Sequence, residues 1–234
     1  MNLAGELRNI IKGDVSTAVD DLELASHDAS IFEVVPEVVV APQSVEDIEK
    51  LVKYVNEQRT SPSTGSTGSP QAGSGQISLT ARSAGTDMSG GPLSESIIVD
   101  FLKYFAGIKN IDEAKQEATV LPGTYYRDFE KATLEKGLLM PSYPASKGLC
   151  TVGGIVANNS GGEKSLTYGK TEDYVKGLKV VFADGKEYTT KPLNKSELDE
   201  KMAQNDFEGK VYRELFELVS KNKDLLAKAK PKVH

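Results

Sequence analysis

Cysteine and histidine are scarce in this sequence, and each scarcity excludes a class of site. The one cysteine, Cys150, excludes an internal disulfide and fits a reducing compartment. The two histidines, His27 and His234, give little support to zinc catalysis or to a Ser-His-Asp triad. We therefore predict no metal site, and we interpret His27 as a loop residue, with a role as ligand or base left as the alternative.

Long apolar runs and positive charge are also in short supply. No apolar run approaches the length of a membrane span, and the N-terminal segment MNLAGELRNIIKG lacks the apolar core of a secretory signal. The formal net charge of −6 argues against a general nucleic-acid binder, which would normally show a basic face. We expect a cytoplasmic globular protein with no transmembrane segment and no nucleic-acid partner.

The first half of the chain alternates strand and helix patterns. A short apolar strand covers 38–40, and the Ser-x-x-Asp pattern at 44–47 predicts the capped start of a helix that ends near Gln58. Further strands are expected at 77–81 and 97–100. Because strands separated by helices usually pair in parallel, we expect these three to form a small parallel sheet.

The second half predicts a mixed, largely antiparallel unit. A strand is expected at 117–121, a helix at 126–133 and a last helix at 211–219. Between the two helices, the segment 178–190 alternates like a hairpin, with Asp184-Gly185 as a two-residue turn. The fold class expected for the whole chain is therefore α+β.

A low-complexity segment, TSPSTGSTGSPQAGSGQ at 60–76, interrupts the first half. Its serine, glycine, threonine and proline residues cannot pack a core, so a mobile loop or linker is expected. Its place between a helix and a strand indicates an insertion rather than a domain boundary, and an engineered origin stays open.

Two glycine-rich segments carry the candidate chemistry. The first, Arg82–Gly91, follows a strand and reads RSAGTDMSGG, so its backbone N–H groups can curl inward as a nest for phosphate oxygens. It matches neither the Walker loop nor the Rossmann fingerprint, and a plain tight turn is the alternative. The second, 138–169, combines small residues, hydroxyls and two adjacent asparagines, as in one wall of a cofactor pocket. A loose surface loop is its alternative.

Together these segments resemble the FAD-binding, PCMH-type domain of the vanillyl-alcohol oxidase superfamily. The branch that is most similar contains FAD-linked D-lactate dehydrogenase and the glycolate oxidase flavin subunit. Four motifs in order carry the resemblance, and they span roughly 30–190. They are R-x-x-G-T-x-x-S-G-G at 82–91, V-x-P-G with G-L-x-x-P-x-x-P-x-S at 120–123 and 137–146, T-V-G-G-x-x-A with N-S-G-G and Y-G at 151–169, and V-x-G-L-x-V-V-x-A-D-G at 175–185.

The resemblance implies that FAD lies between two α/β subdomains, at 1–105 and 106–234. It implies a pyrophosphate loop, a second stretch along the flavin ring and ribityl chain, and residues that close the pocket. The implied cofactor-binding residues are Ser83, Ala84, Gly85, Thr86, Asp87 and Ser89 in the loop, then Tyr143, Ser146, Thr151, Gly153 and Gly154, and finally Asn159, Tyr168 and, near the adenine, Val175.

The sequence also departs from the family pattern. Some relatives attach FAD covalently through a histidine in the phosphate loop, and Thr86 stands at that position, so noncovalent binding is expected. Tyr143 replaces a frequent aspartate. The family's substrate or cap domain, its G-S-E-G-T-L-G segment and its catalytic histidine and arginine have no match, so a flavin-domain fragment is expected. Asp87 is expected to serve as a turn residue.

The function implied by the resemblance is oxidation of a D-2-hydroxy acid such as D-lactate or glycolate by hydride transfer to flavin. The catalytic base and the electron acceptor are left unassigned, and membrane association of the full enzyme stays open. One alternative is a noncatalytic FAD-binding subunit that needs a partner chain. The other is a flavoenzyme similar to enolpyruvylglucosamine reductase.

Overall fold

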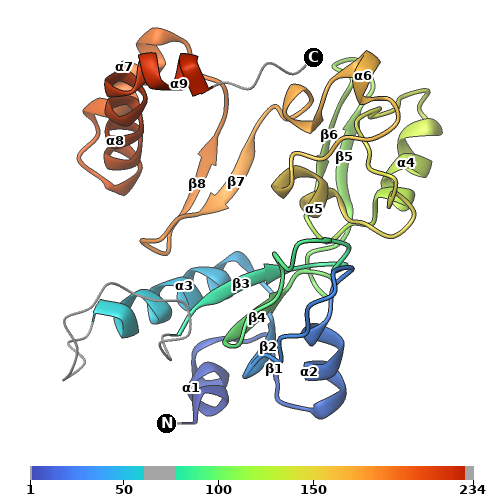
Figure 1. The fold of residues 1–234 in the computed structure, drawn as a ribbon, viewed down its shortest axis with the longest axis vertical. Helices are drawn as coiled ribbons and strands as arrows, with labels where there is room; N and C mark the ends of the chain where they lie inside the picture. Colours follow the sequence, from blue (N-terminus) through green and yellow to red (C-terminus); the bar gives the residue numbers. More distant parts are fainter. Residues whose placement is uncertain (1, 61–76, 230–234) are drawn as a thin grey trace. The chain divides into compact units, whose positions relative to one another are not determined.

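The structure is a computed structural model that describes residues 2–60 and 77–229 (Figure 1). The chain forms two compact units, of which the first ends at Val175 and the second begins at Lys176. The low-complexity segment predicted to be a mobile loop lies outside the described residues, except for Thr60. The prediction of two cofactor-binding subdomains that meet near residue 105 stays a prediction.

The first sheet of unit 1 has the order β1-β2-β4-β3. Its strands β2 (Val38–Ala41), β4 (Ile97–Asp100) and β3 (Leu79–Arg82) are parallel, as the sequence predicts. Strand β1 (Asp14–Ser16) pairs antiparallel with β2 at the edge and was not predicted. A strand this short is held by its neighbour's backbone and leaves almost no periodic signal in the sequence.

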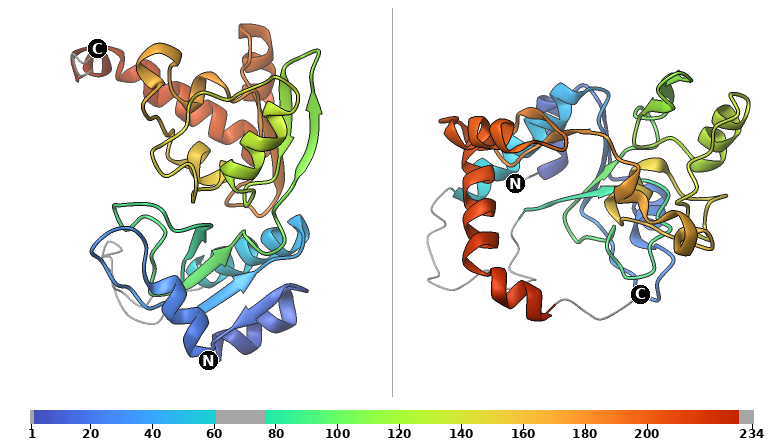
Figure 2. Two further views of the ribbon diagram at one scale, coloured as in Figure 1. Left: turned by 90° about the vertical axis from the view of Figure 1, so that its right-hand side faces the viewer. Right: turned by 90° about the horizontal axis from the view of Figure 1, so that it is seen from above.

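Helices α1 (Leu3–Ile10) and α3 (Val45–Thr60) share one core with this sheet, and Figure 2 shows them beside its strands. Strand β4 is apolar from Ile97 to Val99 because both of its faces are covered. Ile97, Ile98 and Val99 are all buried, although consecutive side chains point to opposite faces. Helix α2 (Val19–Ser26) contacts β2, and it also was not predicted.

The predicted N-terminal cap of α3 is present, and Asp47 within it also makes tertiary hydrogen bonds. The Asp47 N–H donates to Ser44 Oγ at 3.2 Å, as a capped helix start requires. The Asp47 side chain is buried, and its carboxylate accepts the N–H groups of Lys12, Gly13 and Gln43 at 2.9–3.0 Å. One carboxylate thereby ties α3 to the turn that follows α1.

A second core forms in the later part of unit 1. Strands β5 (Ile108–Asp112) and β6 (Glu117–Val120) make an antiparallel ribbon, of which only β6 was predicted. The predicted helix appears as α4 (Tyr126–Leu134). Tyr126, Phe129, Tyr143, Cys150 and Ile155 are the buried members of this core. The Tyr126 hydroxyl donates to the Met140 carbonyl at 2.6 Å, and burial raises the pKa of that hydroxyl.

Unit 2 begins with the predicted hairpin, β7 (Leu178–Val181) and β8 (Glu187–Thr190). The predicted two-residue turn is wrong. The Phe182 N–H donates to the Lys186 carbonyl at 3.1 Å and the Gly185 N–H to the Phe182 carbonyl at 2.8 Å, so three residues form the loop. Gly185 ends it with φ of +69°, the left-handed position of a three-residue hairpin loop.

Helices complete unit 2. The predicted last helix lies within α8 (Phe207–Lys221). The helices α7 (Lys195–Ala203) and α9 (Lys223–Ala229) were not predicted as such. Helices and both kinds of strand pairing confirm the α+β fold class.

Candidate functional site

The first glycine-rich segment begins where β3 ends, at the edge of the sheet. Within the described part of the chain, the backbone N–H groups of Ser83, Ala84, Gly85 and Thr86 have no hydrogen-bond acceptor. Gly85 has φ of +63°, a left-handed conformation that L side chains rarely adopt. Successive unpaired N–H groups around a left-handed residue are the arrangement that binds anionic oxygens.

Asp87 closes this loop as the predicted turn residue. Its Oδ2 atom accepts the Ser89 N–H at 2.9 Å, the Ser89 hydroxyl at 2.7 Å and the Gly91 N–H at 3.0 Å. The hydrogen bond from the Ser89 hydroxyl, followed by those from the two backbone groups, lowers the pKa of Asp87. The Ser89 hydroxyl therefore already has an acceptor within the loop.

The Arg82 side chain fixes the start of the loop to the end of helix α2. Its Nη2 atom donates to the carbonyls of Leu24 at 3.2 Å and His27 at 2.6 Å. Burial lowers the pKa of the guanidinium, and the carboxylates of Asp28 and Asp100 act in the opposite direction. His27 itself is exposed, with Nε2 3.7 Å from Glu33 Oε1, which fits the interpretation as a loop residue.

Thr151 is the point at which the second glycine-rich segment meets the first. Its Oγ1 lies 2.7 Å from Ser83 Oγ, although the two residues are 68 positions apart. The same Oγ1 accepts the Gly154 N–H at 3.2 Å and so caps helix α5 (Val152–Ala157). A Cβ placed on Gly154 would lie 3.7 Å from Ser83 Oγ. Ser83, Thr151 and Gly154 thus come together at one place.

Gly153-Gly154 and Gly161-Gly162 do not use the backbone angles that glycine alone adopts freely. None of the four has a positive φ, and the first pair lies inside α5. The lack of space for a side chain explains why glycine stands at two of these positions. A Cβ on Gly153 would lie 2.5 Å from Pro122 Cβ and 2.7 Å from its carbonyl oxygen, and one on Gly162 only 2.1 Å from the Tyr143 carbonyl oxygen.

Tyr143 and Ser146 lie in the loop that precedes Thr151. Tyr143 is buried, and its hydroxyl donates to Glu163 Oε1 at 3.0 Å, while Lys147 Nζ lies 4.4 Å from its ring centre. The carbonyl of Ser146 accepts the N–H of Cys150 at 2.9 Å. A pocket of about 130 Å³ borders Tyr143, Lys147 and Glu163. It is smaller than the roughly 300–1,000 Å³ of a typical ligand site, so it is not by itself a dinucleotide site.

The remaining predicted residues lie further along unit 1. Asn159 has φ of +44°, and its Oδ1 accepts the Glu172 N–H at 2.9 Å. Tyr168 is exposed at the end of α6 (Ser165–Tyr168), where its carbonyl accepts the hydroxyl of Tyr174 at 2.6 Å. Val175 is half-buried at the end of the unit. The contacts that fix these residues are made within their own part of the chain, so their role in binding stays a prediction.

The described residues contain neither a metal-binding cluster nor a membrane-spanning helix. No cluster of three or more His, Cys, Asp or Glu side chains there could hold a metal ion. No helix in residues 2–60 or 77–229 is long and apolar enough to cross a membrane.

Sequence comparison assigns the fold and the glycine-rich segments to a known class. Residues 36–191 match the family described as FAD binding domain. That match covers more than half of the chain, and the chain therefore belongs to this FAD-binding family, as the four motifs indicated.

The curated relatives are an oxidase subunit and dehydrogenases by name. The chain is 34% identical over 162 residues to the glycolate oxidase subunit GlcD of Bacillus subtilis, a match over 68% of this chain and 31% of the relative. It is 26% identical over 229 residues to the D-2-hydroxyglutarate dehydrogenase of Pseudomonas putida, over 97% of this chain and 21% of the relative. It is 30% identical over 151 residues to the D-lactate dehydrogenase of Archaeoglobus fulgidus, over 64% and 30%. The chain thus spans about a third or less of these relatives.

Solved structures share the fold. Chitooligosaccharide oxidase superposes with a TM-score of 0.65 at 14% identity, over 86% of this chain and 39% of that one. The 6-hydroxy-D-nicotine oxidase of Arthrobacter nicotinovorans gives a TM-score of 0.62 at 21% identity, over 77% and 36%. At these identities the likeness is one of fold alone.

Proposed function

We propose that this chain binds FAD noncovalently and forms the flavin domain of an oxidoreductase that acts on a 2-hydroxy acid. In this proposal Ser83, Ala84, Gly85, Thr86 and Asp87 hold the diphosphate. Thr86 stands where some relatives carry a flavin-linking histidine, and a threonine hydroxyl is not expected to form that bond. The residues proposed beyond the loop are Ser89, Tyr143, Ser146, Thr151, Gly153, Gly154, Asn159, Tyr168 and Val175.

The observation that carries this proposal is the contact between Ser83 and Thr151. Their oxygens lie 2.7 Å apart, so the two glycine-rich segments meet at one place. Beside that contact, the N–H groups of Ser83 to Thr86 have no hydrogen-bond acceptor within the described residues and can donate to a ligand. Gly85 has the left-handed backbone of an anion-binding nest, and its missing Cβ leaves room for the Arg82 guanidinium, while a Cβ on Gly154 would contact Ser83 Oγ at 3.7 Å. These features fit a dinucleotide diphosphate.

The chain's own residues supply binding and orientation. The loop N–H groups offset the negative charge of the diphosphate, and Thr151 fixes the start of α5 next to them. Two separate cores, one around Val38 and Ile97 and one around Tyr126 and Ile155, support the proposed subdomains at 1–105 and from 106 onward. Bound FAD supplies a two-electron acceptor for the oxidation.

The substrate class rests on the relatives, which are named for glycolate, D-lactate and D-2-hydroxyglutarate. Because the chain spans only 21–31% of those relatives, we assign no catalytic base and no electron acceptor to it. The proposed activity belongs to the whole flavoenzyme, and the proposed share of this chain is to hold the cofactor.

The test is a titration of the full chain with FAD, followed by anaerobic addition of substrates. Quenching of FAD fluorescence with saturation is expected, and no saturable binding would refute the proposal. Loss of the flavin absorbance after D-lactate, glycolate or D-2-hydroxyglutarate would support a complete hydroxy-acid site. Bleaching by NADPH alone would favour the reductase alternative, and binding without any bleaching would favour the noncatalytic module.

A further inference from the structure

The loop that follows α2 lies against the glycine-rich loop and holds it at three places. The Nη2 atom of Arg82 donates to the carbonyls at the end of α2. The Ala29 N–H donates to the Asp87 carbonyl at 2.9 Å. The Gly90 N–H donates to Asp28 Oδ2 at 3.0 Å. The hydrogen bonds that involve side chains join residues 55–62 positions apart in the chain, so these contacts are tertiary rather than local.

Asp28 is the centre of this arrangement. Its Oδ1 accepts the Ser30 N–H at 2.8 Å, which forms the turn that presents the neighbouring Ala29 N–H. Its Oδ2 holds Gly90, whose φ of +83° turns the chain at the far end of the glycine-rich loop. Its negative charge acts on the Arg82 guanidinium at the near end. The half-buried Asp28 carboxylate therefore accepts a hydrogen bond at the far end of the loop and acts electrostatically on Arg82 at the near end.

The middle of the loop differs from its ends in its hydrogen bonding. Its ends use their hydrogen-bonding groups on the segment around Asp28, whereas the N–H groups of Ser83 to Thr86 have no acceptor within residues 2–60 and 77–229. A loop fixed in this state loses little conformational freedom when it binds an anion, and such pre-organisation strengthens binding. A loop without the Asp28 contacts would have to become ordered at the moment of binding.

We propose that Asp28 is a positioning residue that pre-organises the glycine-rich loop for the diphosphate of FAD. This inference rests on the proposed function, since it assigns the loop to the cofactor's diphosphate. Asp28 does not itself touch the cofactor in this proposal, and it acts through Gly90 and Ala29. The sequence motif at 82–91 does not include it, and only the fold brings it there.

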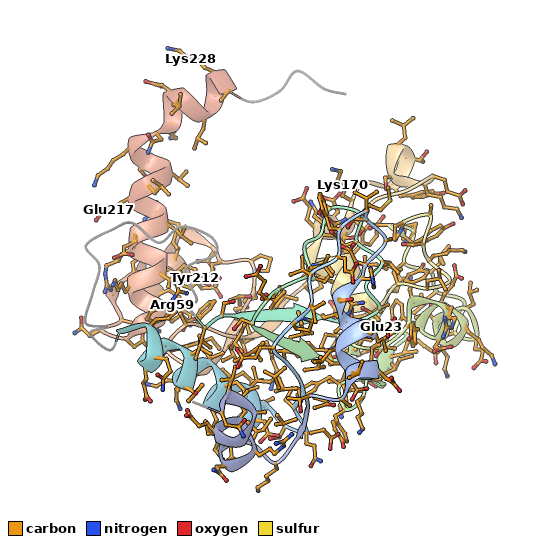
Figure 3. The ribbon with its side chains drawn as sticks, turned by 60° about the horizontal axis from the view of Figure 1, so that its bottom comes forward. Glu23, Arg59, Lys170, Tyr212, Glu217 and Lys228 are labelled. Carbon is orange, nitrogen blue, oxygen red and sulfur yellow. The ribbon has the colours of Figure 1, made fainter. Side chains whose placement is uncertain are left out.

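The test compares Asp28→Ala and Asp28→Asn with Glu23→Gln in the full chain. Glu23 lies exposed on α2 (Figure 3), so its replacement removes one nearby negative charge without touching the loop. A hydrogen bond to a carboxylate contributes about 1.5–3 kcal/mol, and each 1.4 kcal/mol is tenfold in affinity. We expect Asp28→Ala to weaken FAD binding by about tenfold or more, Asp28→Asn to have an intermediate effect, and Glu23→Gln to bind like wild type.

The readout that separates positioning from general damage is binding of riboflavin, which lacks phosphate. Asp28→Ala is expected to weaken FAD binding while it leaves riboflavin affinity, measured by competition, unchanged. Equal losses for FAD and riboflavin would overturn the inference, and so would wild-type FAD affinity in both Asp28 variants. Absence of FAD binding in wild type and in Glu23→Gln would instead refute the proposed function. If Asp28→Ala does not fold, Asp28→Asn decides the same question.

Discussion

Ser83 and Thr151 lie 68 positions apart in the chain, and their hydroxyl oxygens lie 2.7 Å apart in the fold. Ser83 follows the last residue of β3, and Thr151 precedes the first residue of α5. The contact therefore joins the end of a strand in the first core to the start of a helix in the second.

The hydroxyl pair should show measurable coupling. A double-mutant cycle of Ser83→Ala and Thr151→Val is expected to give a coupling free energy of unfolding of about 0.5–1.5 kcal/mol, the usual net value of a hydrogen bond. Thr151→Val alone should cost more than Ser83→Ala, because Thr151 Oγ1 also caps α5. Thr151→Ser retains the hydroxyl and serves as the control. Additive effects in chemical denaturation would show that the contact has no energetic weight.

Gly85→Val should abolish FAD binding. At φ of +63° a β-branched residue is strained, and its Cβ would lie 2.5 Å from Arg82 Nη2, so the loop must change shape. We expect affinity to fall by at least about tenfold in a fluorescence titration, since a left-handed L residue alone costs roughly 1–2 kcal/mol. Gly137→Val is the matched control: φ there is +70° and nothing lies within 4 Å of the added Cβ. It should lower stability yet bind FAD normally. Wild-type affinity in Gly85→Val would contradict the assignment of the loop.

The neighbouring glycines of α5 should separate stability from binding. In Gly153→Ala the new methyl group would meet the Pro122 backbone at 2.7–2.8 Å, so we expect overpacking to cost about 1–3 kcal/mol of unfolding free energy. In Gly154→Ala the methyl group would lie 3.4 Å from Thr151 Oγ1, its nearest neighbour. Alanine stabilises a helix by about 1 kcal/mol relative to glycine. Gly154→Ala should therefore fold at least as well as wild type and bind FAD more weakly. The reverse ranking in thermal unfolding would disprove this division.

Asp87 should make the loop sensitive to acid. Hydrogen bonds lower its pKa in the folded protein below the ordinary 3.8, so the unfolded chain binds the proton first as the pH falls. Its contribution to stability is therefore fully present above about pH 4 and is lost as the pH falls through the lowered folded pKa. The free energy of unfolding should be measured by chemical denaturation at pH values from about 6 to about 2.5. Wild type should be more stable than Asp87→Asn at the upper end of this range and should lose that difference as the pH falls below about 4. An advantage that is independent of pH would argue against the carboxylate as the cause.

The parallel strands β2, β3 and β4, helix α4 and the hairpin β7–β8 could be predicted from sequence because their signals are local. Apolar runs, a capped helix start and a glycine at a turn act over a few neighbouring residues. Among the elements that were missed, β1, α2 and β5 lack a strong pattern. Each is short and is defined by a partner strand or a covering surface rather than by its own residues.

For the candidate site, the sequence by itself determined that two glycine-rich segments exist and that the first can form an anion-binding nest. Tertiary structure decided the rest. That Gly153 and Gly162 are small because of Pro122 and Tyr143, and that Asp28 holds Gly90, depends on residues 19–62 positions away. No local pattern records such contacts, because they arise only when distant segments pack together. The same packing places Ser83 beside Thr151, where the two separate motifs meet.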